Sequence, residues 1–334
     1  MSMIRTLCGK DNSDMETIEN TMEFKLHNTA VCLGKFDGIH IGHQLLLNRI
    51  VKEKSKGRAS VVFTFALHPA NLFSDKKIDL IDTQEEKKKK LQESGVDILI
   101  SYPFTKETAS MEPERFIEEV LVGQLDVKVI VIGRDFHFGY KRKGNVELLK
   151  KMAQKYSYEV IDYDKITYKG EIVSSTRIRS SIEKGDLELA ASLLGRPYEI
   201  TEEVLHGQQL GRTIGVPTIN QTVVPEKILP ANGVYVSTVR IGQKTYGAIT
   251  NIGCKPTVGE LFQKGVETNI FDYSGDLYGR IITVQLHAFV RGERKFESVN
   301  TLVCQMHKDI AYAKEYLNRE GFMGVEGFRR TVTK

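Results

Sequence analysis

Two histidines, His40 and His43, stand three residues apart in the stretch LGKFDGIHIGH, which covers residues 33–43. A short apolar run precedes this stretch, three glycines punctuate it, and an amphipathic segment follows it. The order predicts a strand, a tight turn that approaches a ligand closely, and a helix that begins near Gly42. A helix N-terminus offers free N–H groups and positive potential to phosphate, and residues three apart on a helix share one side. We therefore interpret the stretch as a phosphate site, with a plain turn as the alternative.

A second set of polar side chains lies in the C-terminal half. Thr218 and Asn220 alternate along an extended segment, so both side chains can point one way. Oxygen ligands suit Mg²⁺, which prefers a few protein ligands beside phosphates and water. Taken alone, a threonine and an asparagine here are more typical of an ordinary turn, and Glu267 is more typical of a solvent-facing strand residue.

The elements that must position the histidines follow from hydrophobic patterning. Runs rich in Val, Ile and Leu predict buried parallel strands at residues 30–33, 60–65, 97–100 and 127–132. Helical patterns lie between and after them, at residues 43–55, 84–94, 113–122 and 145–156. The first helix is expected to direct Leu45, Leu46 and Ile50 inward. Strands that alternate with helices of this length indicate βαβ units and a doubly wound sheet, and the polar residues 1–27 suggest a loosely structured start.

Beyond about residue 197 the pattern changes to short strands punctuated by Gly, Pro and Asn, which suggests an antiparallel barrel or sandwich. These strands are expected at residues 198–205, 234–241, 245–252, 266–272 and 281–290. A long helix, residues 299–318, closes the chain. Two short helices, residues 174–183 and 186–194, come before the change of pattern. We therefore place the domain boundary there, with residues 1–186 in the first domain and residues 187–334 in the second.

Composition and charge exclude several classes of protein. The 334 residues are 41% hydrophobic and 27% charged, with a formal net charge of +4, which is typical of a globular protein. The modest charge and the lack of an aromatic-basic motif argue against nucleic acid as a partner. Four scattered cysteines without a C-x-x-C pair indicate reduced thiols in a cytoplasmic protein. No stretch of about 20 apolar residues is present, so we expect no membrane association.

One run of charges, EEKKKK at residues 85–90, has two interpretations. Glu85 and Lys89 are four residues apart, as are Glu86 and Lys90, which favours a solvated helix face with ion pairs along it. A functional basic patch is the alternative. We expect the solvated face because charge runs are usually surface features.

Four segments of the first half together resemble the bacterial bifunctional riboflavin kinase/FMN adenylyltransferase (FAD synthetase) family, within the nucleotidyltransferase superfamily whose signature is H-x-G-H. Residues 31–47 resemble the opening G-x-F-D-G-x-H-x-G-H of that family. Phe65 and His68-Pro69 resemble its F-x-P-H-P, with a leucine in place of the first proline. The stretch IGRDFHFGYKRK, residues 132–143, is similar to its G-x-D-F-R-F-G and basic loop, and SSTRIR, residues 174–179, matches its late nucleotide-binding element.

The resemblance implies an adenylyl-transfer site. The two histidines would bind the phosphates of ATP while the α-phosphorus is attacked and pyrophosphate leaves, so that positioning and charge stabilisation do the catalysis. The implied catalytic and ATP-binding residues are Gly34, Phe36, Asp37, Gly38, His40, His43, Ser174, Thr176 and Arg177. The implied flavin-binding residues are His68, Asp135, Phe136 and Gly139. From the residues alone, Arg177 and Arg179 are also typical of a solvated helix start, and Phe136 and Phe138 of core packing.

The second half resembles the riboflavin kinase part of the same family. The matching segments are GRTIGVPTIN (211–220), NIGCKPT (251–257), VETN (266–269), DLYG (276–279) and residues 289–309. The resemblance implies that Thr218 and Asn220 hold the Mg²⁺ of ATP. It also implies that Glu267 is the general base that accepts the proton of the riboflavin 5′-hydroxyl as it attacks the γ-phosphate. The implied phosphate loop comprises Gly207, Gly211, Arg212 and Gly215, and the implied flavin region comprises Asn251, Tyr278 and Arg291.

The resemblance covers roughly residues 29–315 and sets the expected fold and function. The fold would be an α/β, Rossmann-like doubly wound nucleotidyltransferase domain, followed by an antiparallel β-barrel riboflavin kinase domain with a closing helix. The protein would be a cytoplasmic transferase of FAD biosynthesis, with riboflavin, FMN and ATP as its small-molecule partners. It would phosphorylate riboflavin to FMN and adenylylate FMN to FAD, with Mg²⁺ in both steps. The oligomeric state stays open.

Two departures from the family pattern keep an alternative open. Asn269 stands where the family usually has a histidine, and Glu202 stands where it usually has a glycine. In the alternative, the chain is an FMN adenylyltransferase only, and its C-terminal domain is a non-catalytic flavin-binding or regulatory module. A nucleotidyltransferase for another acceptor, such as phosphopantetheine or glycerol phosphate, would also have H-x-G-H. The kinase-like half and the stretch GRDFHFG argue against that acceptor class.

Overall fold

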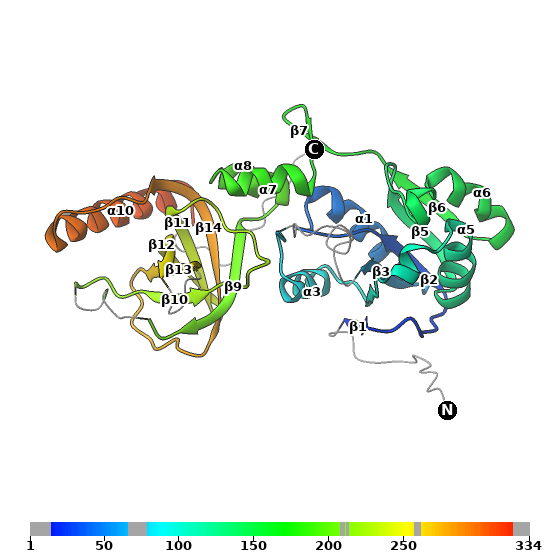
Figure 1. Ribbon diagram of the computed structural model, residues 1–334, viewed down its shortest axis with the longest axis horizontal. Coiled ribbons are helices and arrows are strands. Elements are labelled where there is room, and N and C mark those ends of the chain that lie inside the picture. The colour runs from blue at the N-terminus through cyan, green and yellow to red at the C-terminus, as the bar shows by residue number, and fades with distance from the viewer. Residues whose placement is uncertain (1–14, 66–78, 208–210, 212–213, 257–261, 323–334) are drawn as a thin grey trace. The chain divides into compact units, whose positions relative to one another are not determined.

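The computed structural model describes residues 15–65, 79–207, 211, 214–256 and 262–322. The chain divides into two compact units, Met1–Ser175 and Thr176–Lys334. The division lies at the start of helix α7 (Ser175–Glu183; Figure 1). The domain boundary after residue 186, which the sequence suggests, stays a prediction.

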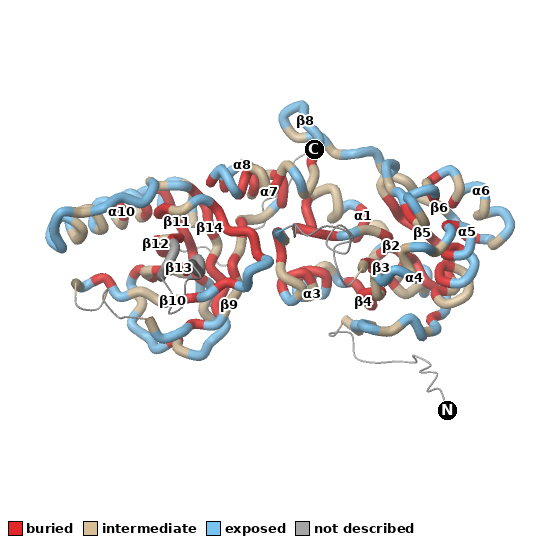
Figure 2. Tube along the Cα trace, viewed as in Figure 1, coloured by how far each residue is buried: buried red, intermediate tan, exposed pale blue. Residues whose placement is uncertain are grey.

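The first unit is built on a parallel sheet with the strand order β1-β4-β3-β2-β5-β6. Its strands are β1 (Glu16–Glu19), β2 (Thr29–Leu33), β3 (Ala59–Phe65), β4 (Ile98–Tyr102), β5 (Val127–Gly133) and β6 (Glu159–Tyr163). Strands β2 to β5 are buried almost throughout (Figure 2), because helices cover both faces of the sheet. Their runs of Val, Ile and Leu follow from this burial, and the prediction of a doubly wound sheet is confirmed.

The sheet also contains two strands that the patterning does not predict. Strand β1 pairs in parallel with β4, from Glu16 opposite Ile98 to Glu19 opposite Ser101. The prediction of a loosely structured start is therefore wrong for these residues. Strand β1 alternates half-buried and exposed positions, and β6 has no fully buried residue. Both strands lie at sheet edges, so they lack the apolar run by which interior strands are recognised.

Helices cover the two faces of the sheet with separate apolar clusters. Helices α1 (Ile41–Lys52) and α3 (Gln84–Glu93) contribute to the cluster on one face, whereas η2 (Phe116–Gln124) and α6 (Val146–Tyr156) contribute to the cluster on the other. Helix α1 buries Leu46, Leu47 and Ile50, but Leu45 is 41% exposed, so its predicted inward position is wrong. The short elements are η1 (Glu53–Lys56), α4 (Lys106–Ala109), α5 (Pro113–Arg115), η3 (Tyr140–Arg142), β7 (Thr167–Tyr168) and β8 (Glu171–Ile172).

The charged run at residues 85–90 lies on α3, and the prediction of a solvated face holds for only part of it. The buried members are Glu86, Lys87 and Lys90. Glu86 forms a capping box with Thr83 at the start of the helix. The ammonium group of Lys90 pairs with the buried carboxylate of Asp82 at 3.2 Å. Spacing along a helix cannot reveal such partners, because they come from the segment before the helix and from the packing of the helix on the sheet.

The second unit is a closed barrel with the strand order β10-β13-β12-β11-β14-β9. Its strands are β9 (Tyr198–Leu205), β10 (Ile219–Thr222), β11 (Gly233–Ile241), β12 (Lys244–Pro256), β13 (Phe262–Ile270) and β14 (Ile281–Gly292). All pairings are antiparallel. The predicted barrel is confirmed. Strand β10, which carries Asn220, is too short and polar to be recognised as a strand by its pattern.

Helices α7, α8 (Leu187–Leu194) and α10 (Val299–Arg319) accompany the barrel strands in this unit. Helix α10 packs Ala313, Tyr316 and Leu317 against the outer face of the barrel, where Val234 and Val236 of β11 lie. The predicted closing helix is therefore present. Because α10 packs on the outside of the barrel, the strand residues that contact it face outward. This orientation shows which polar residues of the strands lie on the outer face of the barrel.

Candidate active sites

The chain leaves β2 through a turn in the left-handed backbone region. Phe36, Gly38 and Ile39 have φ angles of 51°, 86° and 37°. A β-branched residue rarely adopts a positive φ, so the surrounding structure must hold Ile39 there. At Gly38 a Cβ atom would lie 3.0 Å from the side chain of Ile81, so only glycine fits without displacement. Gly34, at the entry to the turn, lies under the ring of Phe36.

His40 and His43 meet at the start of α1. His40 is the N-cap, and its side chain accepts a hydrogen bond from the backbone N–H of His43 at Nδ1 (3.3 Å). The two imidazole rings stack with centroids 3.7 Å apart and planes 14° from parallel. Because Nδ1 of His40 is an acceptor, a neutral His40 must carry its proton on Nε2, where it can be donated to a ligand. The first turn of α1 contains no acidic residue that would repel an anion.

Burial disfavours the protonated form of both imidazoles. Burial lowers the pKa of His40 from 6.5 to about 4. Burial also lowers the pKa of His43 well below its usual range, and the neighbouring His40 lowers it further, while the carboxylate of Asp82 acts in the opposite direction. Among the described residues, Nδ1 of His43 is one of few buried side-chain atoms without a hydrogen-bond partner. A phosphate would supply both the missing partner and the negative charge that favours protonation.

Asp37 connects the turn to other parts of the first unit. Its carboxylate is buried and accepts the backbone N–H of Ile81 at 2.9 Å. Its backbone carbonyl accepts the hydroxyl of Ser175 at 2.9 Å. The segment SSTRIR therefore reaches the turn through Ser175, next to the predicted Ser174, which is half-buried. Thr176 and Arg177 follow on the first turn of α7, the former exposed and the latter half-buried.

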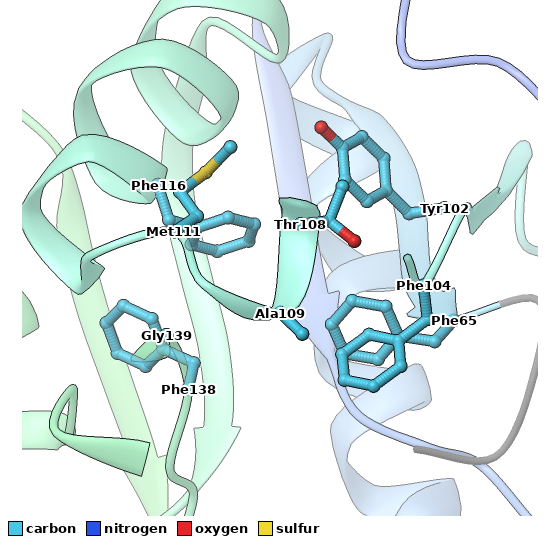
Figure 3. A pocket seen from close by; sticks show the side chains of 9 residues that line it. All are labelled: Phe65, Tyr102, Phe104, Thr108, Ala109, Met111, Phe116, Phe138 and Gly139. Atoms are coloured by element: carbon cyan, nitrogen blue, oxygen red, sulfur yellow. The ribbon is translucent and has the colours of Figure 1, made fainter. Parts of the chain in front are cut away.

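An apolar pocket opens at the carboxyl edge of the same sheet. Phe65 ends β3, Tyr102 lies at the end of β4, and Phe138 follows β5. Figure 3 shows Phe65, Phe104 and Tyr102 on one side of the pocket and Phe116, Phe138 and Met111 on the other. The residues that line the pocket are Phe65, Tyr102, Phe104, Thr108, Ala109, Met111, Phe116, Phe138 and Gly139.

The pocket and the histidines lie on opposite faces of the sheet but flank one strand. The pocket residues belong to the cluster that η2 and α6 cover, whereas Phe36 and α1 belong to the cluster on the other face. Strand β2, which ends in the turn, lies between β3 and β5. Two ligands that approach from the two faces would therefore meet where β2 ends, at the edge of a parallel sheet where ligands commonly bind.

The residues predicted to bind flavin do not all line this pocket. Gly139 does, with a φ of 70°. Phe136 stacks on the pocket residue Phe138, with centroids 5.8 Å apart, and thus supports the lining. Asp135 is 61% exposed and pairs with Lys165 at 2.8 Å. His68 lies outside the described residues.

In the barrel, three polar residues from separate strands form one row. Asn220 of β10 is opposite Glu267 of β13, and Glu267 is opposite Asn251 of β12. Directly opposed residues point to the same face of a sheet. The row continues to Val234, which packs under α10, so it lies on the outer face of the barrel. The prediction from sequence grouped Asn251 with the flavin region, and the structure places it beside Glu267.

The loop that precedes Asn220 approaches it closely. A Cβ atom on Gly207 would lie 2.5 Å from the amide nitrogen of Asn220, so the glycine backbone sits directly against this side chain. The N–H of Val216 donates to the carbonyl of Gly211 at 2.8 Å, which closes the loop that also contains Gly215. Arg212 lies outside the described residues. Thr218, half-buried, comes immediately before β10.

Tyr278 and Arg291 contact different parts of the second unit. Tyr278 stacks on His206, with ring centroids 3.8 Å apart, next to Gly207. Arg291 of β14 pairs with the buried Asp309 of α10 at 2.7 Å. Of the three residues predicted for the kinase flavin region, Tyr278 therefore adjoins the phosphate-loop side, and Arg291 adjoins the closing helix.

The ligand set around Asn220 fits a hard cation that keeps other ligands. Among the described residues, no group of three or more His, Cys, Asp or Glu side chains could hold a metal ion. Thr218 and Asn220 offer neutral oxygens, and Glu267 is opposite Asn220. This set is too weak to enclose a metal alone, but it fits Mg²⁺ that takes further ligands from nucleotide phosphates and water.

Several residues of these sites escape sequence reasoning. Asp82 lies near His43, yet it precedes a helix in an unremarkable segment. The role of His206 is likewise revealed only by its contact with Tyr278. Asn269 is recognisable in the sequence as a departure from the family pattern, and the structure adds that its amide donates to the carbonyl of Pro217 at 2.7 Å. Asn269 thus holds the segment next to Thr218.

Comparisons with known proteins agree with the two-unit architecture. The family model for FAD synthetase matches residues 23–177, and that for riboflavin kinase matches residues 194–317. The bifunctional riboflavin kinase/FMN adenylyltransferase of Buchnera aphidicola subsp. Schizaphis graminum is 37% identical over 87% of this chain and 95% of its own. The proteins of the same name from Escherichia coli K12 and Bacillus subtilis 168 are 35% and 34% identical, over 90% and 87% of this chain and 96% and 93% of their own.

A solved structure matches almost the entire chain. The crystal structure of a macrolide-efflux protein from Streptococcus pneumoniae is 32% identical to it, with a TM-score of 0.81, and the match covers 90% of this chain and 99% of that one. In the part of the chain that the structure describes, no helix is both long and apolar enough to cross a membrane.

Proposed function

The chain belongs to the bifunctional riboflavin kinase/FMN adenylyltransferase family, and from that premise we propose which residues carry each of its two reactions. The protein is a transferase of FAD biosynthesis: it phosphorylates riboflavin to FMN with ATP and adenylylates FMN to FAD with release of pyrophosphate. Because both family models match, the interpretation of the second half as a non-catalytic module is not needed.

For adenylyl transfer, the observation that supports the assignment most strongly is the pair of stacked imidazoles at the start of α1. His40 donates from Nε2 to the phosphates of ATP, and His43 binds beside it. As the FMN phosphate attacks the α-phosphorus, both stabilise the charge that builds toward pyrophosphate. Gly34, Phe36, Gly38 and the N–H groups of α1 line the phosphates, and Ser174, Thr176 and Arg177 complete the nucleotide site.

The flavin of the acceptor occupies the apolar pocket on the other face of the sheet. Its aromatic lining suits an isoalloxazine ring, which is planar and can stack on aromatic side chains. Phe136 and Gly139 belong to this region, and the family resemblance assigns His68 and Asp135 to flavin binding as well. The FMN phosphate then reaches the end of β2 from one face, and the α-phosphate of ATP reaches it from the other.

For riboflavin phosphorylation, the row Asn220–Glu267–Asn251 supports the assignment. Glu267 accepts the proton of the 5′-hydroxyl, while Gly207, Gly211, Arg212 and Gly215 cover the phosphates. Asn251, Tyr278 and Arg291 bound the flavin. Thr218 and Asn220 hold Mg²⁺, which neutralises phosphate charge when it is bound.

We further propose that the protein acts in the cytoplasm on small molecules alone. The described cysteines Cys32 and Cys304 are free thiols, as expected for a reducing compartment. The modest net charge of +4 supports small anions as partners instead of nucleic acid or a membrane surface.

The test follows flavins by chromatography after purified protein is incubated with riboflavin, ATP and Mg²⁺. We expect FMN first and FAD later, and neither after chelation of Mg²⁺. His43→Gln should accumulate FMN without FAD, because only the adenylyl-transfer site loses a ligand. A His43→Gln variant that forms FAD at the normal rate would refute the assignment of this histidine.

A further inference from the structure

The turn between β2 and α1, residues 34–40, leads into the two histidines and is called the histidine turn below. A buried group of charges lies behind it, on the side of α3. Its carboxylates are Asp37 and Asp82, which are 7% and 4% exposed. Its ammonium groups are Lys87 and Lys90, which are 7% and 9% exposed. Burial lowers the pKa of Lys87, whereas Asp37 and Asp82 raise it, so these charges lie close enough to interact.

Two contacts link this group to the catalytic turn through residues 81–82. The N–H of Ile81 donates to Asp37, and the side chain of Ile81 fills the space that a Cβ on Gly38 would need. Asp82, the next residue, pairs with Lys90 at 3.2 Å. The capping box of Thr83 and Glu86 then fixes the start of α3 directly after Asp82. Residues 81–83 therefore join the turn to a helix whose position is set by its own packing.

This arrangement is costly for a purely structural role. Removing charged groups from water costs several kcal/mol per ion, and apolar residues of similar volume often stabilise a fold as well or better. The turn, in contrast, holds Phe36 and Ile39 at positive φ and stacks two imidazoles at its end, so it needs an external support. A buried ion pair has a defined geometry that an apolar contact lacks, which suits this support.

We propose that Asp82 is a positioning residue of the adenylyl-transfer site, which holds the histidine turn in place through Ile81 on one side and its ion pair with Lys90 on the other. The proposal rests on the function assigned to His40 and His43. Asp82 is 4% exposed, so its carboxylate acts through the turn and not on the substrate itself. It keeps the turn in the geometry that the transition state requires. Its carboxylate also lies close enough to His43 to favour protonation of that imidazole.

The experiment compares Asp82→Asn, Lys90→Gln and Lys89→Gln in the full chain. Lys89 lies on the exposed side of the same helix and is the matched control. FAD formation from FMN is measured against ATP concentration, and phosphorylation of riboflavin by the same preparation reports intact protein. We expect Asp82→Asn to lower kcat for FAD formation about 10- to 100-fold, as for displaced catalytic groups, with a much smaller change in KM for ATP. Lys90→Gln should lower kcat in the same direction, and Lys89→Gln should not.

Combination variants and a fold control decide the remaining outcomes. If the ion pair is the positioning contact, Asp82→Asn with Lys90→Gln should lose no more than the larger single loss. Wild-type kcat in Asp82→Asn, or an equal loss in Lys89→Gln, would overturn the proposal. If Asp82→Asn does not fold, Lys90→Gln carries the test, and normal kcat in that variant counts against it. If His43→Gln loses FAD formation while Asp82→Asn does not, only the positioning role fails. If His43→Gln retains it, the proposed function itself fails.

Discussion

Asn220 and Glu267 face each other across strands β10 and β13, although 46 residues lie between them in the chain. Thr250 and Thr268, one position along the neighbouring strands, bond to each other at 2.9 Å inside the barrel. The alternation of a strand therefore places Asn220 and Glu267 outside, on the face where Gly207 approaches. A proposed metal ligand and a proposed general base thus share one surface.

Glu267→Gln should remove riboflavin phosphorylation and leave FAD formation from supplied FMN intact. An amide cannot accept the proton of the 5′-hydroxyl, and general bases typically contribute about 10²- to 10⁴-fold. Initial rates of both reactions on one preparation measure this separation. Glu226→Gln, an exposed carboxylate in the same unit, is the control. Phosphorylation within a factor of about two of wild type would exclude Glu267 as the base.

Gly207→Ala should impair the kinase through Asn220. The new methyl group would lie 2.5 Å from the Asn220 amide and force it to rotate away from the proposed Mg²⁺ site. We expect a higher Mg²⁺ requirement for FMN formation and a loss of about 10-fold or more at limiting Mg²⁺. Gly242→Ala, where the Cβ meets nothing within 4 Å, controls for the loss of a glycine in the same barrel. An unchanged Mg²⁺ titration would argue against the arrangement.

Phe104→Ala should weaken FMN binding in the first unit. Phe104 lines the apolar pocket and contacts the ring of Phe65, with centroids 4.8 Å apart, yet it is only half-buried, so the fold should tolerate the change. The loss of one aromatic wall should raise KM for FMN in FAD formation about 10-fold, which corresponds to about 1.4 kcal/mol. KM for riboflavin in the kinase reaction, measured in parallel, should stay the same. A normal KM for FMN would place the flavin elsewhere.

The free energy of unfolding of the first unit should fall as the pH is lowered from 6.5 to about 4, the range between the ordinary pKa of histidine and the pKa of His40. The pKa of His40 is about 4 in the folded protein and 6.5 as an ordinary histidine, so the unfolded chain binds the proton first. Stability is therefore complete above pH 6.5 and decreases toward pH 4, by up to about 3 kcal/mol from this group. Hydrogen exchange of residues 29–33 in β2 reports the opening free energy of this unit. His40→Gln should reduce the slope between these pH values, with His43 contributing the remainder because its pKa is also lowered. An equal slope in both proteins would contradict the assignment.

Local patterns in the sequence account for much of this protein. The βαβ order around His40 and His43, the turn before a helix that begins near Gly42, and the change to short strands after residue 197 follow from apolar periodicity and glycine placement. These signals depend on neighbours a few residues away. The motif resemblance then predicts both activities, and the family comparisons confirm them. Apolar periodicity does not predict edge strands such as β1, because they carry no continuous apolar run.

The tertiary structure alone decides the relationships between distant segments. No spacing along the chain predicts that Asn220 faces Glu267 or that Phe65 and Phe138 line one pocket. Nor does it predict that Lys87 and Lys90 are buried, because the pattern of their helix indicates a solvated face. Strand register and helix orientation depend on the free energy of packing the whole unit, which sums many contacts between residues far apart in sequence. The sequence by itself determined which chemical groups are available and which local elements carry them. The packing of the units decided which of these groups meet, because only long-range contacts bring them to one place.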